Sequence, residues 1–258
     1  MNRYRLVTLG FLLLAASAFF LFEGVSRVLA FVLLLLVYLA VFGLGVVQIG
    51  MGFFGPAVCH GPRDRPRVAL TFDDGPEPKN TLEVLDVLRT FNAPATFFLV
   101  GRRVDRHPEV VKAILEEGHA IGNHTYNHHW WSNLLRKKGL TTEIEACQEA
   151  IFHVAKVRPS FFRPPAGLTN PHLHGALKKL GMILVGWEVR PFDTRSSTEK
   201  VFKRIVSRTR PGSIILLHDQ GKPPGEITTL LTALIPGLRA RGFQIAGLPD
   251  LLGREACL

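Results

Sequence analysis

The stretch "LTFDDGPEPKN", residues 70–80, places two acidic side chains, Asp73 and Asp74, where an apolar run ends. A Gly-Pro pair follows them directly. Two adjacent carboxylates repel each other, so one is pushed toward its neutral form unless a cation holds both. Asp-Gly and Gly-Pro pairs are also common in ordinary solvated turns. The stretch therefore predicts either a plain turn after a strand or part of a cation site at a strand end.

The sequence on both sides of this stretch alternates short apolar runs with amphipathic segments whose apolar residues have helical spacing. The expected strands are residues 68–72, 95–100, 120–124, 161–164, 182–187, 213–218 and 243–248. Strands that alternate with helices predict a parallel sheet. We therefore expect an α/β fold over residues 66–250, a distorted or incomplete β/α barrel of about seven strands. In such barrels the chemistry gathers at the carboxyl ends of the strands.

Residues 1–58 are expected to form a membrane segment with two transmembrane helices, at about residues 6–22 and 28–54. Neither run carries a charge. The second run exceeds the roughly 20 residues that a spanning helix needs, and the first is at the short end of the usable range. A signal peptide is the alternative for the first run, but no convincing small-residue cleavage site precedes the second. The pattern favours a transmembrane helical hairpin in front of the barrel.

Arginines flank the outer ends of this hairpin. Arg3 and Arg5 precede the first run, and Arg63, Arg65 and Arg67 follow the second. Short cytoplasmic segments carry an excess of such residues. We therefore expect an integral membrane protein of a bacterial inner membrane, with the α/β domain on the cytoplasmic side. A periplasmic or extracellular domain is the alternative if the first run does not insert.

The net charge and the motif content limit the kinds of partner that this chain is expected to bind. A formal net charge of +10 indicates an anionic partner. The chain has no RNP-like signature, no zinc-finger spacing and no basic recognition helix, so we expect membrane lipids and no nucleic acid. Three cysteines at wide spacings give neither a disulfide framework nor a CxxC metal site.

Histidines follow the third expected strand in "NHTYNHH", residues 123–129. His124 and His128 are four residues apart, so on a helical turn they share one face and can share a metal. His129 is an alternative partner, and a polar turn with incidental histidines is the alternative interpretation. The stretch is not HExxH, so a catalytic base has to come from elsewhere in the chain.

Further ionisable side chains stand at other strand ends. Arg163 follows the fourth expected strand in "FFRPPAG", and Asp193 follows the fifth in "WEVRPFDTR". His218 and Asp219 end the sixth in "LLHD". Taken alone, an Arg is usually a surface residue, and a His after four apolar residues is more often a core residue. Five strand ends that each carry an ionisable pair or an Arg are nevertheless not the pattern of ordinary turns.

The motifs "TFDDGP", "HTYNH", "RPPAG", "FDT" and "LLHD", in this order, resemble the motif set of the polysaccharide deacetylases. This is the carbohydrate esterase family that shares the chitooligosaccharide deacetylase (NodB homology) domain. The resemblance covers roughly residues 66–250. It implies a hydrolase that removes an N-acyl group, acetyl or formyl, from an aminosugar.

The resemblance also implies a ligand set and a base. The family's second Asp and two histidines, here Asp74, His124 and His128, bind one divalent metal ion, commonly zinc. One carboxylate and two imidazoles suit zinc or a similar transition metal, with Co, Ni, Mn or Fe as alternatives. The first Asp, here Asp73, is implied to be the general base.

The remaining roles are carried over in the same way. Arg163 is implied to fix and tune the base, and Asp193 to orient His218, which would protonate the leaving amine. A backbone N–H near Ala166 is implied to hold the oxyanion. Many members have an aromatic residue where this chain has Ala166, so one sugar-stacking face is lost.

The fourth motif departs from the family pattern at one position. Many members have Trp directly after the motif's Asp, whereas Asp193 is followed by Thr194. Glu188 is therefore a rival for the role of Asp193.

The side of the membrane decides which substrate is within reach. A cytoplasmic domain would meet an N-acylated aminosugar linked to polyprenyl phosphate, as in the branch that deformylates or deacetylates lipid-linked aminosugars. An outward-facing domain would modify peptidoglycan, chitin or an exopolysaccharide. A membrane-tethered carbohydrate-binding protein without catalysis is the alternative from a different class.

Overall fold

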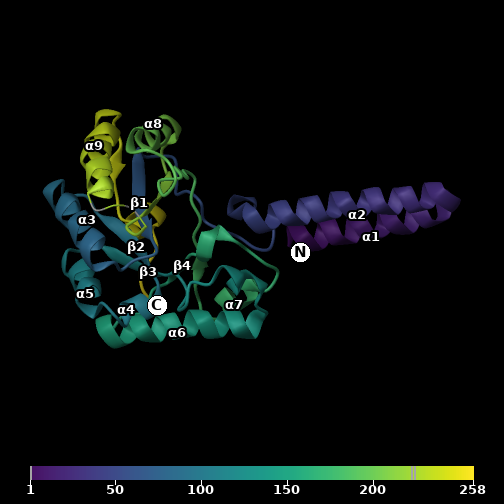
Figure 1. Ribbon diagram of the computed structural model, residues 1–258, viewed down its shortest axis with the longest axis horizontal. Coiled ribbons are helices and arrows are strands. Elements are labelled where there is room, and N and C mark those ends of the chain that lie inside the picture. The colour runs from purple at the N-terminus through teal and green to yellow at the C-terminus, as the bar shows by residue number, and fades with distance from the viewer. Residues whose placement is uncertain (1, 222, 224) are drawn as a thin grey trace.

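Seven parallel strands form one curled sheet in the computed structural model, which describes residues 2–221, 223 and 225–258 (Figure 1). The strands are β1 (Arg67–Asp73), β2 (Ala95–Leu99), β3 (Ala120–Asn123), β4 (Phe161–Phe162), β5 (Ile183–Leu184), β6 (Ile214–His218) and β7 (Gln244–Ile245). Their order is β5-β4-β3-β2-β1-β6, and β7 pairs with β1. Between β5 and β6 the described residues make only isolated bridges, such as the one between Val189 and Ile215. The predicted incomplete α/β barrel of seven strands is confirmed.

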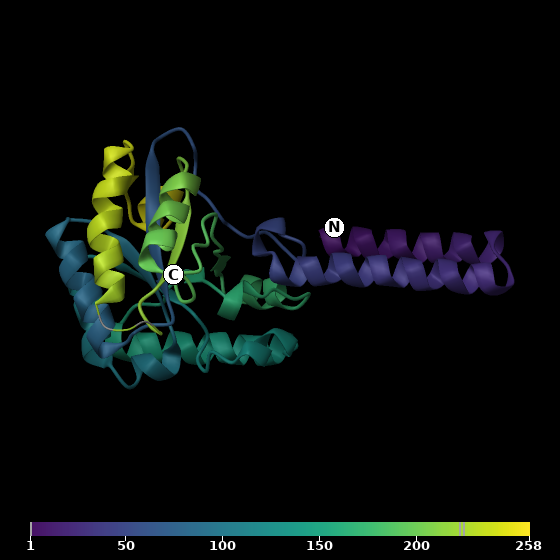
Figure 2. The same cartoon turned by 45° about the horizontal axis from the view of Figure 1, so that its top comes forward.

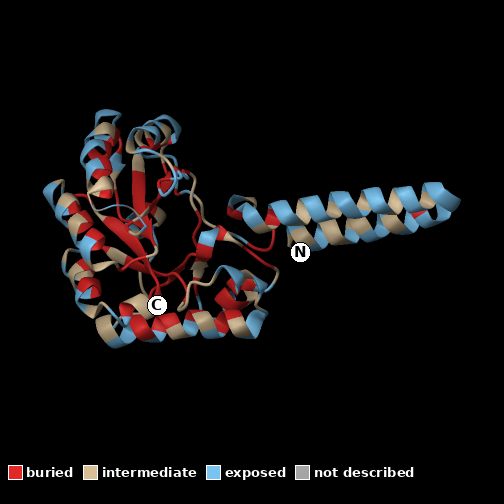
Figure 3. Cartoon of the chain, viewed as in Figure 1, coloured by how far each residue is buried: buried red, intermediate tan, exposed pale blue. Residues whose placement is uncertain are grey.

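Helices cover the outer face of the sheet, where the buried residues in red in Figure 3 line the strands and the inward helix surfaces. They are α3 (Pro78–Thr90), α4 (Gly101–Val104), α5 (Pro108–Glu116), α6 (Lys137–Ala155), α7 (Leu173–Lys179), α8 (Thr198–Arg208) and α9 (Glu226–Ala240). A short helix, α10 (Leu248–Leu252), and three 3₁₀ segments, η1 (Ile49–Met51), η2 (Trp130–Leu134) and η3 (Pro165–Gly167), complete the fold. Figure 2 shows α8 and α9 beside β1.

Alternation along β1 separates the outer core from the concave side of the sheet. Leu70 and Phe72 pack with the outer helices, whereas Ala69 belongs to a separate cluster with Leu248 and Leu251 of α10. Because successive strand residues point to opposite faces, Asp73 lies on the same concave face as Ala69. The strand thus directs its terminal carboxylate into the barrel.

The register of the strands brings their carboxyl ends to one level. Asp73 at the end of β1 pairs with Phe98 on one side and His218 on the other. Asn123 at the end of β3 pairs with Leu99 and Phe162. The residues that follow these positions, including His124 and Arg163, therefore lie along the same rim.

The N-terminal segment forms two adjoining helices, α1 (Arg3–Leu21) and α2 (Gly24–Val47), which extend away from the α/β unit (Figure 1). In each helix, only 6% of the most apolar 18-residue stretch is buried. Both are long and apolar enough to cross a membrane. Their composition suits a membrane anchor or a signal sequence.

The prediction that the second helix spans residues 28–54 is wrong at its end, because α2 stops at Val47. The chain then makes the turn η1 and passes through Gly52, whose φ of 56° is left-handed. Phe53 and Phe54 are buried, and their rings contact Tyr4 and Phe42. The apolar residues Ile49, Phe53 and Phe54 of this stretch are thus buried at the base of the hairpin.

The α/β unit also uses residues outside the predicted range of 66–250. Val58 N–H donates to the carbonyl of Leu184 at 2.8 Å. This bond joins the segment between η1 and β1, which we call the linker, to the edge of the sheet at β5. At the other end, Ser160 N–H donates to the carbonyl of Ala256 at 2.9 Å. Both segments therefore stabilise the β4–β5 edge of the sheet.

Candidate active site

Asp74, His124 and His128 form one cluster at the carboxyl ends of β1 and β3. Asp74 Oδ1 lies 3.3 Å from His124 Nε2 and 2.9 Å from His128 Nε2. Strand alternation alone would point Asp74 away from Asp73. The φ of 75° at Asp74 breaks that alternation, and His128 is also left-handed with a φ of 56°. These two turn conformations direct the side chains toward one point.

The donor atoms of this cluster fit a divalent metal ion. His124 Nδ1 lies 2.7 Å from the carbonyl of Arg163, so it carries the proton and leaves the lone pair of Nε2 facing Asp74. His128 Nε2 is buried and has no hydrogen-bond partner among the described residues, although Asp74 is close. One atom from each of the three residues lies within 4.8 Å of the others. A carboxylate with two imidazoles is a donor set for zinc-like ions.

The electrostatics of the cluster also favour charged ligands. Burial would raise the pKa of Asp74, but its close contacts with the His124 and His128 rings outweigh burial and lower that pKa below its ordinary value. The carboxylate is therefore ionised and ready to bind a cation at neutral pH.

Arg163 holds Asp73 beside this cluster. The guanidinium is fully buried, and its Nη1 donates to Asp73 Oδ1 at 2.6 Å and to Thr71 Oγ1 at 2.9 Å. Its Nη2 donates to the carbonyl of Gly186 at 2.9 Å, and the group lies 4.0 Å from the centre of the Phe98 ring. One oxygen of Asp73 is thus fixed by a charge-assisted bond.

The other oxygen of Asp73 faces the histidines. Asp73 Oδ2 lies 3.9 Å from His124 Nε2. The two adjacent acids therefore have different partners: Asp73 has the arginine and Asp74 has the imidazoles. Each of the two adjacent carboxylates thus has a nitrogen donor of its own.

Asp193 binds the third histidine, His218, at two points. The backbone N–H of His218 donates to Asp193 Oδ2 at 2.8 Å, and His218 Nδ1 lies 3.0 Å from Asp193 Oδ1. Burial would lower the pKa of His218, but the hydrogen bond and charge of Asp193 outweigh it and raise that pKa to about 9. Phe192, with a left-handed φ of 56°, turns the loop so that Asp193 reaches β6.

The rival residue Glu188 lies with other partners. Its carboxylate is 2.6 Å from Arg63 Nη2 and accepts a hydrogen bond from Ser213 Oγ at 2.6 Å. The structure therefore brings Asp193, and not Glu188, to His218.

Ala166 lies in η3, in the turn that follows Arg163. It is exposed, and its φ of 54° is left-handed. A Cβ on the next residue, Gly167, would lie 2.2 Å from the Trp187 ring, so only glycine allows this turn to approach that indole. The turn carrying the expected oxyanion N–H is thus held against the same strands as Arg163.

Asp219 was not among the residues expected in the site. It is buried, and its Oδ2 accepts a hydrogen bond from Thr81 Oγ1 at 2.5 Å. A Cβ at Gly75 would lie 2.5 Å from that same oxygen, so glycine is required beside it. Burial raises the pKa of Asp219 to about 7. In the sequence, only its position directly after His218 at the end of an apolar run marked Asp219 as a possible site residue.

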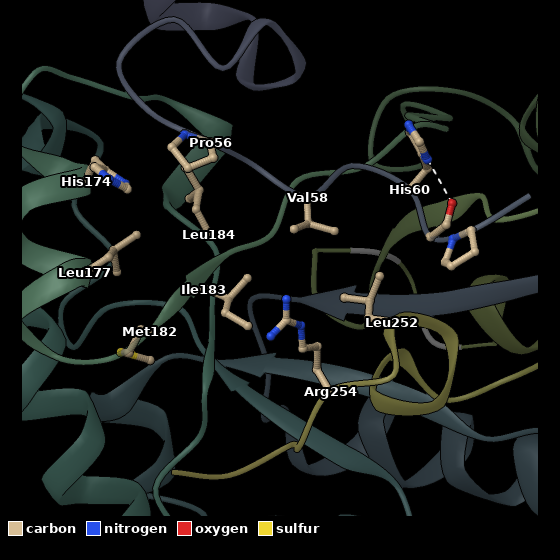
Figure 4. A pocket seen from close by; sticks show the side chains of 12 residues that line it. Pro56, Val58, His60, His174, Leu177, Met182, Ile183, Leu184, Leu252 and Arg254 are labelled. Atoms are coloured by element: carbon tan, nitrogen blue, oxygen red, sulfur yellow. Dashed lines mark hydrogen bonds between the residues drawn. The ribbon is translucent and has the colours of Figure 1, made fainter. Parts of the chain in front are cut away.

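A cavity of about 600 Å³ lies away from this cluster, between the linker, α7 and the edge of β5 (Figure 4). Its walls are mainly apolar, with Leu177, Met182 and Leu184 on one side. His60 and Arg254 supply polar atoms. None of the expected site residues lines it.

Comparison with protein families matches the polysaccharide deacetylase family over residues 60–185. A peptidoglycan-N-acetylglucosamine deacetylase of Bacillus cereus is 36% identical over 194 residues, which are 74% of this chain and 90% of that protein. A chitooligosaccharide deacetylase of Bradyrhizobium is 36% identical over 198 residues, which are 71% of this chain and 90% of that protein.

Solved structures show the same relationship. The crystal structure of a peptidoglycan N-acetylglucosamine deacetylase has a TM-score of 0.74 at 32% identity and covers 78% of this chain and 95% of its own. A family 4 carbohydrate esterase from Streptomyces lividans, solved with acetate, has a TM-score of 0.64 at 32% identity and covers 72% and 92%. The family match over residues 60–185 includes Asp73, Asp74, His124, His128 and Arg163.

Proposed function

The chain belongs to the polysaccharide deacetylase family, and we propose that it removes an N-acyl group from an aminosugar at the Asp74–His124–His128 cluster. The observation that carries this proposal is the convergence of three metal-type donors with a fixed carboxylate and a histidine on one rim. Metal-assisted hydrolysis of an amide uses these parts: a Lewis acid, a base for water and an acid for the amine.

The metal would be held by Asp74, His124 and His128, with zinc as the first choice for this donor set. A bound divalent ion supplies a Lewis acid that polarises the acyl carbonyl and makes water more nucleophilic. The protein holds the ligand side chains in the orientation and tautomer that bind a metal. The carbonyl of Arg163 fixes the His124 ring and the tautomer that binds.

Asp73 would act as the general base. Arg163 occupies its Oδ1, so the free lone pairs of Oδ2 are the ones that face the cluster. The guanidinium also fixes the direction of the carboxylate, because it makes bonds to Thr71 and Gly186 and cannot rotate without losing them. A base held this way accepts the proton of the attacking water without first reorienting.

His218 would act as the general acid for the leaving amine. Its Nδ1 is paired with Asp193, which leaves Nε2 to give its proton to the substrate. A pKa of about 9 keeps the ring protonated near neutrality. The exposed backbone at Ala166 would hold the oxyanion that forms when water attacks.

For the substrate, we favour an aminosugar linked to polyprenyl phosphate at the cytoplasmic face of the membrane. The hairpin of α1 and α2 returns the chain to its starting side, and arginines flank both outer ends. The net charge of +10 suits an anionic lipid surface and a substrate that carries phosphate.

Peptidoglycan is the second candidate, with the domain facing outward. It is favoured by relatives named peptidoglycan deacetylases that are 36% identical and match most of this chain. The chemistry proposed for the site is the same for both substrates, so only the location of the domain separates them.

Two measurements test the proposal. Full-length protein should release acetate from an N-acetylated chitooligosaccharide, and a chelator should stop the release until zinc is restored. If the metal-loaded protein released no acetate, the catalytic proposal would fail and a carbohydrate-binding protein without catalysis would be favoured. For location, reporters fused after Leu258, which is exposed, should fluoresce as a green fluorescent protein fusion and stay inactive as an alkaline phosphatase fusion. The reverse result would select peptidoglycan.

A further inference from the structure

The segment "WWSNLLRKK", residues 130–138, exposes large apolar side chains next to a group of cations. Trp130, Trp131 and Leu134 in η2 are 72%, 45% and 77% exposed. Arg136, Lys137 and Lys138 follow and are exposed as well. We call these six residues the WWL–RKK patch. Contiguous apolar surface of this kind usually marks a contact with a partner or a membrane.

The patch is tied to the end of the helical hairpin through one loop. The Asn170 side chain donates to the carbonyls of Asn133 at 2.6 Å and Leu135 at 3.3 Å. The preceding residue, Thr169, donates from its backbone N–H to the carbonyl of Val46 at 3.0 Å and from Oγ1 to that of Gly45 at 3.0 Å. The loop after η3 therefore binds η2 on one side and the last turn of α2 on the other.

The patch thus lies on the side of the α/β unit from which the hairpin extends. Figure 1 shows α7, which follows this loop, on the same side. Lys178 of α7 is exposed too and adds another cation there. If α2 crosses a bilayer, the boundary of that bilayer lies close to η2.

The patch is also next to the candidate metal cluster. Trp131 stacks on the ring of His129 with their centres 3.8 Å apart and an angle of 11° between the planes. His129 directly follows His128, a member of the cluster. Whatever the patch contacts is therefore brought to the rim of the site.

The residue types of the patch suit one partner, the interface of an anionic bilayer. Tryptophan is enriched where acyl chains meet headgroups, because its ring is apolar with one polar N–H. Lysine and arginine beside such a helix are attracted to anionic lipids. The patch combines both types, and the hairpin provides the adjoining membrane contact.

We propose that the WWL–RKK patch inserts into the membrane interface and holds the rim of the active site against the lipid surface. The site then takes an aminosugar carried on a membrane amphiphile. This proposal rests on the proposed membrane location of the hairpin and deepens the proposed deacetylase function. The competing explanation is that the indoles of Trp130 and Trp131 stack on the rings of a soluble sugar substrate.

The test uses full-length protein in nanodiscs of phosphatidylcholine and phosphatidylglycerol, with a doxyl group near the headgroup on part of the lipid. The chain has three tryptophans, and Trp187 is partly buried beside Arg163. We expect the doxyl lipid to quench most of the emission of Trp130 and Trp131. The double variant Trp130→Phe, Trp131→Phe should lose that quenching and keep its circular dichroism spectrum.

A matched control comes from the far part of α6. Phe152 is exposed there, with Arg158 over its ring. Phe152→Trp, added to the double variant, places an exposed indole away from the hairpin and should be quenched weakly. Equal quenching of this indole and of Trp130 and Trp131, or no quenching of any, would overturn the proposal.

Activity gives a second, independent readout. The variant Trp130→Ser, Trp131→Ser should deacetylate a polyprenyl-phosphate-linked N-acetylglucosamine in the nanodisc several-fold more slowly, and a soluble chitooligosaccharide at an unchanged rate. Equal losses on both substrates would assign the indoles to sugar stacking and overturn the proposal. If the unmodified protein deacetylated neither substrate but were still quenched, the proposed function would fail while the membrane contact stood.

Discussion

Arg163 Nη1 lies 2.6 Å from Asp73 Oδ1, and both side chains are buried where β1 and β4 end. The two residues are far apart in the sequence and come together because the parallel register levels the strand ends. A buried ion pair of this kind is costly to break from one side, because the remaining charge stays in a poorly solvated place. The pair therefore serves both the fold and the proposed chemistry.

Breaking the pair should destabilise the protein strongly. We expect Arg163→Ala to lower the free energy of unfolding by about 3–5 kcal/mol, because it leaves Asp73 buried without its partner. Urea denaturation of the full chain in detergent measures this. The control is Arg63→Ala, which removes the 42%-exposed partner of Glu188 and should cost about 0–1 kcal/mol. Similar losses in both variants would show that burial of the Asp73 pair has no special cost.

The histidines of the cluster should determine metal content. His124→Ala combined with His128→Ala should remove a bound divalent ion, because two of three donors are lost. Elemental analysis of the purified protein measures the effect. His129→Ala is the matched control and should keep the metal, since that ring stacks on Trp131 instead. Full occupancy in the double variant would exclude this site.

Asp73 should be needed for turnover and not for metal. Asp73→Asn keeps the shape of the side chain and leaves Asp74, His124 and His128 in place. Loss of a general base typically reduces the rate about 10²- to 10⁴-fold. Acetate release and metal content measured on the same sample separate the two roles. A variant that lost its metal, or that kept normal turnover, would contradict the assignment of Asp73 as the base.

The pH dependence should report on His218. A general acid works while it is protonated, so activity should fall as the pH rises through a pKa of about 9. Asp193 stabilises the charged ring, so Asp193→Asn should lower that pKa and move the alkaline fall in kcat to lower pH. A pH–rate profile of both proteins checks this. An alkaline limb that does not move would mean that another group donates the proton.

Much of the fold could be predicted from sequence, because the governing interactions are local. Each expected strand is present, with β1 at Arg67–Asp73 where residues 68–72 were expected. The period of the apolar residues carries this information. The end of α2 could not be predicted, because Phe53 and Phe54 look the same in sequence whether they contact lipid or Tyr4.

The sequence by itself determined the α/β fold, its family and which residue types stand at the strand ends. Only the tertiary structure decided which of them meet. It brought Asp193 and not Glu188 to His218 and set Asp219 against Thr81. It also tied η2 to the end of α2 through Asn170 and Thr169. The physical reason is that these contacts join residues far apart in the chain, so they depend on sheet register and on left-handed turns such as the one at Phe192. Periodicity and spacing carry no record of either.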